Sequence, residues 1–260
     1  MPAPQPDPIP VQHQIQQTRK LLLEHYGLTL SVPDVGKRYE LYDEIGRGGL
    51  ATVYLAIDRD LKRQVAVKVL QQRWRERPEV VAQFLHEAKM TARLQHPNVP
   101  HVYDVGFLPT GEIFMAMEKV EGSTLRDILD TPEPADRPRP RRERLMRTFI
   151  QVCQTVAYAH SAGIIHRDLK PENIMVGEFN RVYVMDWGLA RDLREEAMQS
   201  PNPDGAPVPS LKGTPRYMSP EQVLGLHQQV DTRGDVFSLG IILYEILAGR
   251  HPFANDDIRA

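Results

Sequence analysis

The sequence predicts an α+β fold with two lobes, a β-rich lobe with one helix followed by a mainly helical lobe. Short apolar runs typical of strands occupy most of residues 39–120, and a single helical stretch interrupts them. After Gly122 the pattern becomes helical, with only two further β-type runs. A chain of 260 residues with 41% hydrophobic residues is long enough for two compact lobes with a buried core.

Residues 1–38 form a proline-rich lead-in with a short predicted helix at 12–26. Residues 39–121 form the predicted β-rich lobe. Its runs follow one another as in an antiparallel meander, and an amphipathic helix comes after the third run. The expected strands are 39–46, 52–58, 64–70, 101–107 and 112–120, and the expected helix is 78–94.

Residues 122–260 form the predicted helical lobe. Ser123 is expected to cap a short helix that ends at Leu129. The proline- and arginine-rich segment 131–144 is interpreted as a solvated connector rather than as a docking patch for acidic partners. The remaining expected elements are a long helix over 144–161, β-type runs at 173–176 and 181–187, and a helix over 235–249.

Composition excludes several partners. With 32 Lys and Arg against 34 Asp and Glu, no net field attracts the chain to nucleic acid or to an anionic membrane. There is no signal peptide, and the most apolar stretch, 237–249, is too short to span a membrane, so we expect no membrane segment. The single cysteine, Cys153, indicates a reducing compartment. We predict a cytoplasmic chain, free or as the cytoplasmic part of a longer membrane-anchored protein.

A glycine-rich segment lies between the first two predicted strands. Gly46, Gly48 and Gly49 precede Ala51 at a hairpin tip, whereas a dinucleotide-binding fold would place a helix there. Backbone N–H groups at such a tip can close over phosphates. An ordinary glycine-rich turn would look the same, so this motif alone leaves both interpretations open.

Lys68 lies in the apolar run of the third predicted strand. A buried lysine charge is costly unless an anion compensates it, and Glu87 on the next helix together with a nucleotide phosphate would do so. The alternative is a lysine whose ammonium group reaches solvent from the strand end. The neighbouring glycine-rich segment favours the binding role.

Residues 166–173, HRDLKPEN, concentrate ionisable groups directly after a predicted helix. Phosphoryl transfer needs a proton acceptor, a cation near the transferred group and an oxygen ligand for a metal ion. Asp168, Lys170 and Asn173 supply these groups. A charged surface turn would not require all three between apolar runs, so we favour a catalytic loop.

Asp186 follows a β-type run and precedes Trp187 and Gly188. A carboxylate at a strand end beside a flexible glycine suits a metal ligand. By itself an ordinary aspartate turn explains it better, but Asn173 supplies the second oxygen ligand that Mg²⁺ would need. The two residues together predict a metal site.

These motifs, in this order, resemble the signature set of protein kinases from about Tyr39 to the end of the chain. HRDLKPEN is the most specific of them. Lys170 and the segments 96–106 and 213–221 are similar to the eukaryotic-like (Hanks-type) serine/threonine kinases of bacteria. The resemblance implies the bilobal protein-kinase fold, use of ATP with Mg²⁺ or Mn²⁺, and transfer of the γ-phosphoryl group to Ser and Thr hydroxyls of protein substrates.

The resemblance also implies residue roles. Asp168 is the expected catalytic base, Lys170 lies near the γ-phosphate, and Lys68 binds the α- and β-phosphates with Glu87 as its ion-pair partner. Asn173 and Asp186 are the expected metal ligands. The residues expected to bind the nucleotide are Gly46, Gly48, Gly49, Val53, Ala66, Lys68, the gatekeeper Met117, the hinge residues Glu118 and Val120, and Met175.

Regulation is expected at Arg167, whose guanidinium can pair with a phosphorylated residue in the following segment. Ser210 is the first candidate for autophosphorylation, followed by Ser200 and Thr214, although unmodified hydroxyls in a proline-rich loop explain the pattern nearly as well. Thr214 is also expected to line the acceptor pocket, and Asp235 to support the catalytic loop.

Three features depart from the family pattern. Ala51 replaces the third glycine of the loop, and Trp187 stands where phenylalanine is usual, which would alter how this segment switches. The chain stops at Ala260, before the family's last helices and the arginine that normally pairs with Glu221. We therefore expect a helical lobe that is incomplete at its C-terminus.

Two other functions compete with the kinase prediction. A kinase-like ATP-binding module with weak catalysis would signal by conformation or as a homodimer. The missing helices favour it, and the presence of every motif residue opposes it. A small-molecule phosphotransferase would also use two aspartates, but segment 213–221 resembles a peptide-binding element and opposes that function.

Overall fold

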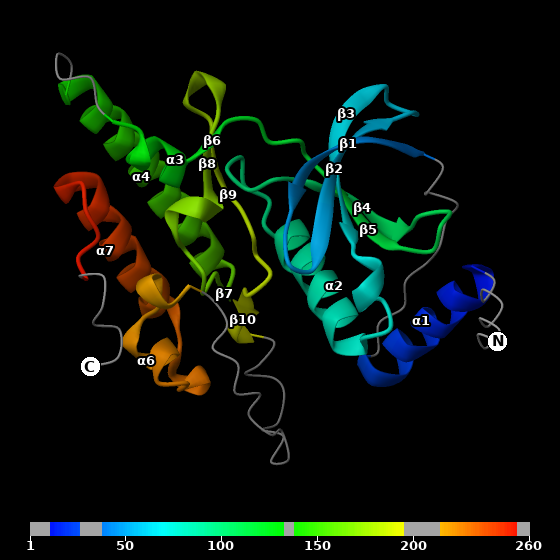
Figure 1. Cartoon of the computed structure of the whole chain (residues 1–260). Coiled ribbons are helices and arrows are strands. Elements are labelled where there is room, and N and C mark those ends of the chain that lie inside the picture. The colour runs from blue at the N-terminus through cyan, green and yellow to red at the C-terminus, as the bar shows by residue number, and fades with distance from the viewer. Residues whose placement is uncertain (1–10, 27–37, 133–137, 195–213, 254–260) are drawn as a thin grey trace, which may run out of the picture. The chain divides into compact units, whose positions relative to one another are not determined.

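The computed structural model describes residues 11–26, 38–132, 138–194 and 214–253 (Figure 1). Within this part, the chain divides into two compact units. The first contains the described residues up to Ala88 together with His101–Lys119, and the second contains Lys89–Pro100 and the described residues from Val120 onward. We refer to them as the β-rich unit and the helical unit.

The β-rich unit is built on a five-stranded antiparallel sheet with the strand order β1-β2-β3-β5-β4. The first three strands follow the predicted meander. The next neighbour of β3 is β5 rather than β4, so β4 lies at the edge of the sheet. The 3-10 helix η2 (Gln72–Trp74) and helix α2 (Pro78–Arg93) follow β3. The strands are β1 (Tyr39–Arg47), β2 (Ala51–Asp58), β3 (Arg63–Leu70), β4 (Val102–Phe107) and β5 (Ile113–Met117).

Each face of this sheet has its own apolar core. Val65 and Val67 of β3 point to one face, where they join Phe114. On the other face Leu70 belongs to the core that receives the apolar side of α2. Ile15 of helix α1 (Val11–Tyr26) is buried in this second core. The alternation along β3 therefore determines which side chains face α2.

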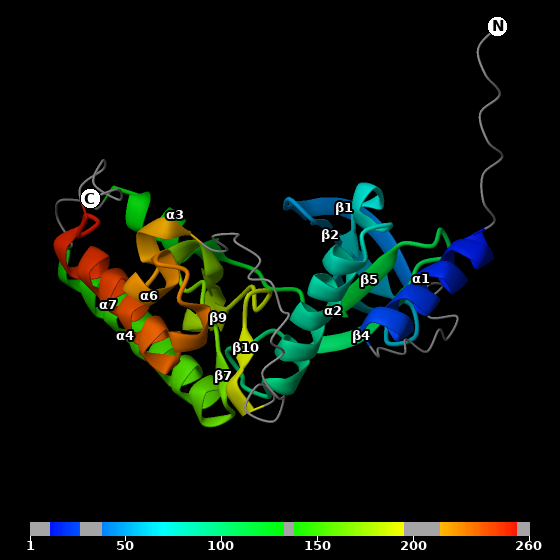
Figure 2. The ribbon, with the colours of Figure 1, turned by 90° about the horizontal axis from the view of Figure 1, so that it is seen from below.

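In its described residues, the helical unit combines two short sheets with four α-helices. Strands β6, β8 and β9 form one sheet, and β7 pairs with β10. Helices α4 and α7 lie side by side (Figures 1 and 2) and contribute to one core with the strands. The elements are β6 (Ser123–Thr124), α3 (Leu125–Asp130), α4 (Pro138–Ser161), β7 (Ile164–Ile165), η3 (Pro171–Asn173), β8 (Ile174–Val176), η4 (Glu178–Asn180), β9 (Val182–Val184), β10 (Arg191–Asp192), η5 (Pro215–Tyr217), α6 (Pro220–Val223), η6 (His227–Gln229) and α7 (Thr232–Ala248).

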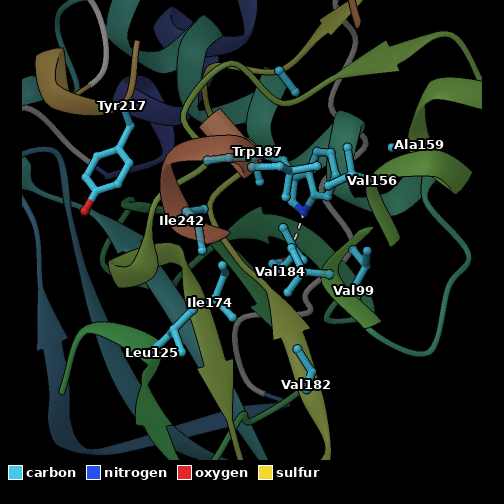
Figure 3. Packing of buried hydrophobic residues seen from close by; sticks show 14 of the residues in the cluster. Val99, Leu125, Val156, Ala159, Ile174, Val182, Val184, Trp187, Tyr217 and Ile242 are labelled. Atoms are coloured by element: carbon cyan, nitrogen blue, oxygen red, sulfur yellow. Dashed lines mark hydrogen bonds between the residues drawn. The ribbon is translucent and has the colours of Figure 1, made fainter. Parts of the chain in front are cut away.

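Trp187 lies inside this core, only 1% exposed (Figure 3). Its indole N–H donates a hydrogen bond to Val184 O at 3.1 Å, and its ring lies 4.5 Å from the His166 ring. A buried indole needs such an acceptor, and here the preceding strand provides it. The tryptophan anchors the start of the segment that follows Asp186.

The α+β prediction is confirmed, but three helix boundaries in the helical unit were wrong, one of them the start of α7, which lies at Thr232 and not at 235. The cap of α3 is Thr124 rather than Ser123, which lies in β6; Thr124 Oγ1 accepts the Asp127 N–H at 3.0 Å, and Asp127 reciprocates. Helix α4 begins at Pro138 and not near 144. Proline suits a first helical turn, because the N–H groups of that turn lack intrahelical partners in any case.

Candidate active site

In the β-rich unit, Lys68 pairs with Glu87. Lys68 Nζ and Glu87 Oε1 are 2.5 Å apart, and the two side chains are 21% and 14% exposed. Lys68 lies between Val67 and Val69, whose side chains take the opposite face of the sheet, so its own side chain points to the α2 face. Glu87 therefore supplies an anion for the Lys68 charge, as predicted from the sequence.

The glycine-rich segment connects β1 to β2. A bond of 2.9 Å from Gly48 N–H to Ala51 O closes its turn. A side-chain carbon added at Gly49 would meet nothing within 4 Å, and one added at Gly48 would make only an ordinary contact at 3.7 Å. Packing inside the unit does not demand these glycines, which fits a need for space above the segment.

The residues expected around adenine occupy several strands. Val53 pairs with Lys68, and Ala66, which is buried, pairs with the gatekeeper Met117. Glu118 donates its backbone N–H to His101 O at 2.8 Å. The Glu118 N–H is therefore engaged within the protein, which argues against a hydrogen bond from this N–H to adenine.

In the helical unit, Met175 is half-buried in β8, and Val120 is the first residue after the β-rich unit.

The catalytic-loop motif begins directly after β7 and is held by Asp235. Asp235, 2% exposed in the first turn of α7, accepts the N–H of His166 at 2.8 Å and the N–H of Arg167 at 2.9 Å. It also contacts His160 Nε2 at 2.8 Å. Arg167 adopts a positive φ of 69°, which costs energy for a non-glycine residue and persists only where its surroundings enforce it. The hydrogen bond from the Arg167 N–H to the Asp235 carboxylate holds the backbone in this conformation.

Asp168 is at the centre of a cluster of polar groups. Its Oδ1 accepts the Thr214 N–H at 3.0 Å, and its Oδ2 lies 2.9 Å from Lys170 Nζ and 3.2 Å from Asn173 Nδ2. Lys170 Nζ also donates to Thr214 Oγ1 at 2.6 Å. An ionised carboxylate has about four acceptor positions, so these three contacts leave room for a hydroxyl donor.

His166 fixes the base of this cluster. The ring is fully buried, its Nδ1 accepts the Asp168 N–H at 3.2 Å, and its Nε2 lies 3.0 Å from Met185 O. Because Nδ1 is an acceptor, Nε2 carries the hydrogen and donates a hydrogen bond to the Met185 carbonyl. The imidazole thereby ties the catalytic loop to the residue before Asp186.

The groups expected to bind a metal fit that role. The side-chain nitrogen of Asn173 donates to Asp168 O at 2.9 Å and to Asp168 Oδ2, and its side-chain oxygen has no hydrogen bond within the described residues. Asp186 is exposed, with a φ of 60°, and in the described part of the chain it accepts only the Gly188 N–H, at 3.3 Å. Within the described ranges no group of three His, Cys, Asp or Glu could hold an ion by itself. One carboxylate and one amide, completed by substrate phosphates, suit Mg²⁺.

Arg167, the expected phosphate-pairing residue, is held through its backbone. Its N–H binds Asp235, and its carbonyl accepts the side chain of the buried Gln222 at 2.8 Å. Ser210 and Ser200 lie outside the described residues. Thr214 lies beside Asp168, as expected for the acceptor pocket.

Sequence reasoning missed a second polar cluster in the helical unit. Arg126 donates to Tyr217 Oη at 2.5 Å and to Glu245 Oε1 at 3.0 Å, and it lies 3.3 Å from Glu172 of the HRDLKPEN motif. Tyr217 in turn donates to Glu245 Oε2 at 2.7 Å. Arg126 and Glu245 are 119 residues apart, and the local signal was an acidic residue in the apolar second half of α7.

Comparison with known proteins agrees with this geometry. Residues 39–260 match the family model described as protein kinase domain. The chain belongs to the protein kinase family. It is 42% identical over 227 residues to the serine/threonine-protein kinase PknB of Mycobacterium leprae, covering 86% of this chain and 34% of that protein. It is 44% identical over 222 residues to PknB of Mycolicibacterium smegmatis, covering 84% and 34%.

A more distant relative is the serine/threonine-protein kinase PknD of Protochlamydia amoebophila, 37% identical over 232 residues, which cover 83% of this chain and 23% of that protein. The kinase chain thus spans about a third or less of the length of these curated relatives. The predicted resemblance to bacterial Hanks-type kinases is confirmed, and the family uses ATP and a divalent metal. Among the helices that the structure describes, none has the length and apolarity to cross a membrane.

Proposed function

We propose that this chain is the catalytic domain of a serine/threonine protein kinase, which transfers the γ-phosphoryl group of ATP to Ser and Thr hydroxyls of protein substrates. The observation that carries the proposal is the cluster around Asp168, in which a nearly buried carboxylate contacts Lys170, Asn173 and Thr214 and keeps an acceptor position. The names of the bacterial relatives support the same substrate class.

In this proposal Asp168 accepts the proton of the attacking hydroxyl, since the Thr214 N–H orients its carboxylate. Lys170 contacts Asp168 and Thr214 and supplies positive charge where the transferred group gains negative charge. In the β-rich unit, Lys68 binds the α- and β-phosphates while Glu87 keeps its ammonium group oriented.

Asn173 and Asp186 would hold Mg²⁺, or Mn²⁺ in its place. When bound, the ion neutralises charge on the phosphate oxygens. The backbone of the glycine-rich segment would cover the phosphates. Glu118 and Val120 would offer backbone hydrogen bonds to adenine beside the gatekeeper Met117, and Val53, Ala66 and Met175 would pack on its ring. Thr214 serves in the acceptor pocket, because its hydroxyl is already bonded to Lys170.

Regulation and location also belong to this proposal. Arg167 would pair with a phosphorylated residue of the following segment, with Ser210 as the first candidate. The domain limits 1–38, 39–121 and 122–260 are proposed on the sequence pattern. A cytoplasmic location is proposed from the single cysteine, and a homodimer is proposed only as part of the weakly catalytic alternative.

The proposal is tested by incubating the chain with labelled ATP, Mg²⁺ and a generic basic protein, beside an Asp168→Asn variant. We expect phosphoserine or phosphothreonine from the unmodified chain and none from the variant, with mass spectrometry reporting whether Ser210 is modified. If neither chain transfers phosphate although ATP raises the melting temperature of both, the kinase-like binding module is the correct function.

A further inference from the structure

The carbonyl groups of the glycine-rich segment accept hydrogen bonds from the linker between β3 and α2, residues 71–77. Gln71 donates from Nε2 to Gly48 O at 2.9 Å and from its backbone N–H to Leu50 O at 3.0 Å. Gly49 O accepts from Trp74 Nε1 at 2.9 Å and from an Arg73 guanidinium nitrogen at 3.0 Å. Three consecutive carbonyls are therefore held by one short linker.

These bonds set the direction of the N–H groups in the same peptide units. No cis peptide occurs among the described residues, and in a trans peptide the C=O and the N–H point in opposite directions. Gly48 O shares its unit with the Gly49 N–H, and Gly49 O shares its unit with the Leu50 N–H. Drawing the two oxygens to the linker turns both N–H groups away from it. Neither N–H donates a hydrogen bond to any residue in the described part of the chain.

The linker is a firm support for these bonds. Trp74 packs against the core shared by the sheet and α2, and the Arg73 guanidinium stacks on its ring with 5.2 Å to the centroid. Gly49 has no comparable packing on its side-chain side, because a side-chain carbon added there would meet nothing within 4 Å. Glycines are conformationally free, so without the linker the two peptide units would sample many orientations.

We infer that Gln71 and Trp74 are positioning residues, which orient the N–H groups of Gly49 and Leu50 for the phosphates of ATP. The inference rests on the proposed function, in which this segment binds ATP. Arg73 assists through its bond to Gly49 O and its stacking on Trp74. The linker acts on phosphate binding and not on adenine binding.

The test compares MgATP with adenosine, which lacks phosphates, by isothermal titration calorimetry. Gln71→Met removes one donor and Trp74→Phe removes the other while keeping an aromatic ring. Gln72→Met is the matched control, since the Gln72 side chain is exposed and makes no hydrogen bond within the described ranges. We expect the Gln71→Met/Trp74→Phe double variant to lose about five- to tenfold in MgATP affinity, with unchanged adenosine affinity and melting temperature.

Two results would overturn the inference. Equal MgATP affinity of the double variant and the unmodified chain would show that the linker does not orient the phosphate donors. Equal losses for MgATP and adenosine would indicate general damage to the unit. A failure of the proposed function is seen separately in the unmodified chain. If it binds ATP but transfers no phosphate, the kinase function fails and the inference stands, whereas if it binds neither ligand the inference falls as well.

Discussion

The candidate site residues of the two units are held in place by different means. In the β-rich unit one partly exposed ion pair, Lys68 with Glu87, and hydrogen bonds at the surface fix the groups expected to bind the nucleotide. In the helical unit Asp168 and its neighbours depend on buried bonds, above all those of Asp235. Substitution of a support in the β-rich unit should therefore change binding and activity, whereas loss of a buried support in the helical unit, such as Asp235, should change the stability of the fold.

Asp235→Ala should have the largest effect on stability. It leaves the buried N–H groups of His166 and Arg167 without an acceptor, so the free energy of unfolding should fall by about 3–5 kcal/mol in urea denaturation. The control is Asp231→Ala at the N-terminus of the same helix, where an exposed cap is lost at a cost of about 1 kcal/mol. Equal losses for the two variants would refute the difference between buried and exposed support.

Lys68→Met should have the opposite profile. Phosphoryl transfer should fall by about 10²–10³-fold, because a preorganised charge near the phosphates is lost. The free energy of unfolding should change by less than about 1 kcal/mol, since the Lys68–Glu87 pair is partly exposed. Steady-state kinetics and urea denaturation of the same preparation check both values. A variant that unfolds as readily as Asp235→Ala would contradict this account.

A substitution at Asp58 tests whether the loss of folding stability depends on the burial of the residue rather than on the unit to which it belongs. Its side chain is fully buried in the β-rich unit, and two hydrogen bonds from Arg38, at 2.8 and 2.7 Å, lower its pKa to about 2. The ionised form thus adds about 2 kcal/mol of stability above about pH 4, which is lost as the pH falls through about 2. Asp58→Asn should be less stable than the unmodified chain at pH 7, and the difference should shrink in acid. A difference independent of pH would disprove the pairing.

Tyr217→Phe should have the smallest effect, about 1 kcal/mol, from the hydrogen bonds to Glu245 and Arg126. Burial raises the pKa of Tyr217, and the hydrogen bond to Glu245 raises it further. The folded state therefore favours the neutral phenol, so this contribution is complete below about pH 10 and is lost as the pH rises beyond it. The stability of the unmodified chain should decline more steeply above that pH than the stability of the variant, as measured by thermal unfolding across a pH series.

Local patterns predicted most of the fold. Alternating apolar residues gave β2 and β3 within one residue at their starts, and apolar periodicity gave α2 within one residue at its end. The start of α4 was missed because prolines and arginines suggested a loop, although Pro138 is compatible with a first turn. Helix boundaries depend on capping chemistry, which several neighbouring residues can supply.

The candidate site was predictable where its residues are close in sequence, as in HRDLKPEN. Contacts between distant segments were not. Nothing in the neighbourhood of Arg126 indicates Glu245, and the bond from Trp74 to Gly49 spans 25 residues. Such pairs arise only from the tertiary arrangement, since the sequence around each side chain is equally compatible with a solvent-exposed position.

The central claim is that Asp168 acts in phosphoryl transfer and not in holding the nucleotide. Its most direct test measures MgATP affinity and single-turnover transfer for Asp168→Asn and the unmodified chain in the same buffer. We expect affinities equal within about twofold and transfer reduced by about 10²–10⁴-fold, the usual contribution of a general base. Unchanged transfer, or a parallel loss of MgATP affinity, would contradict it.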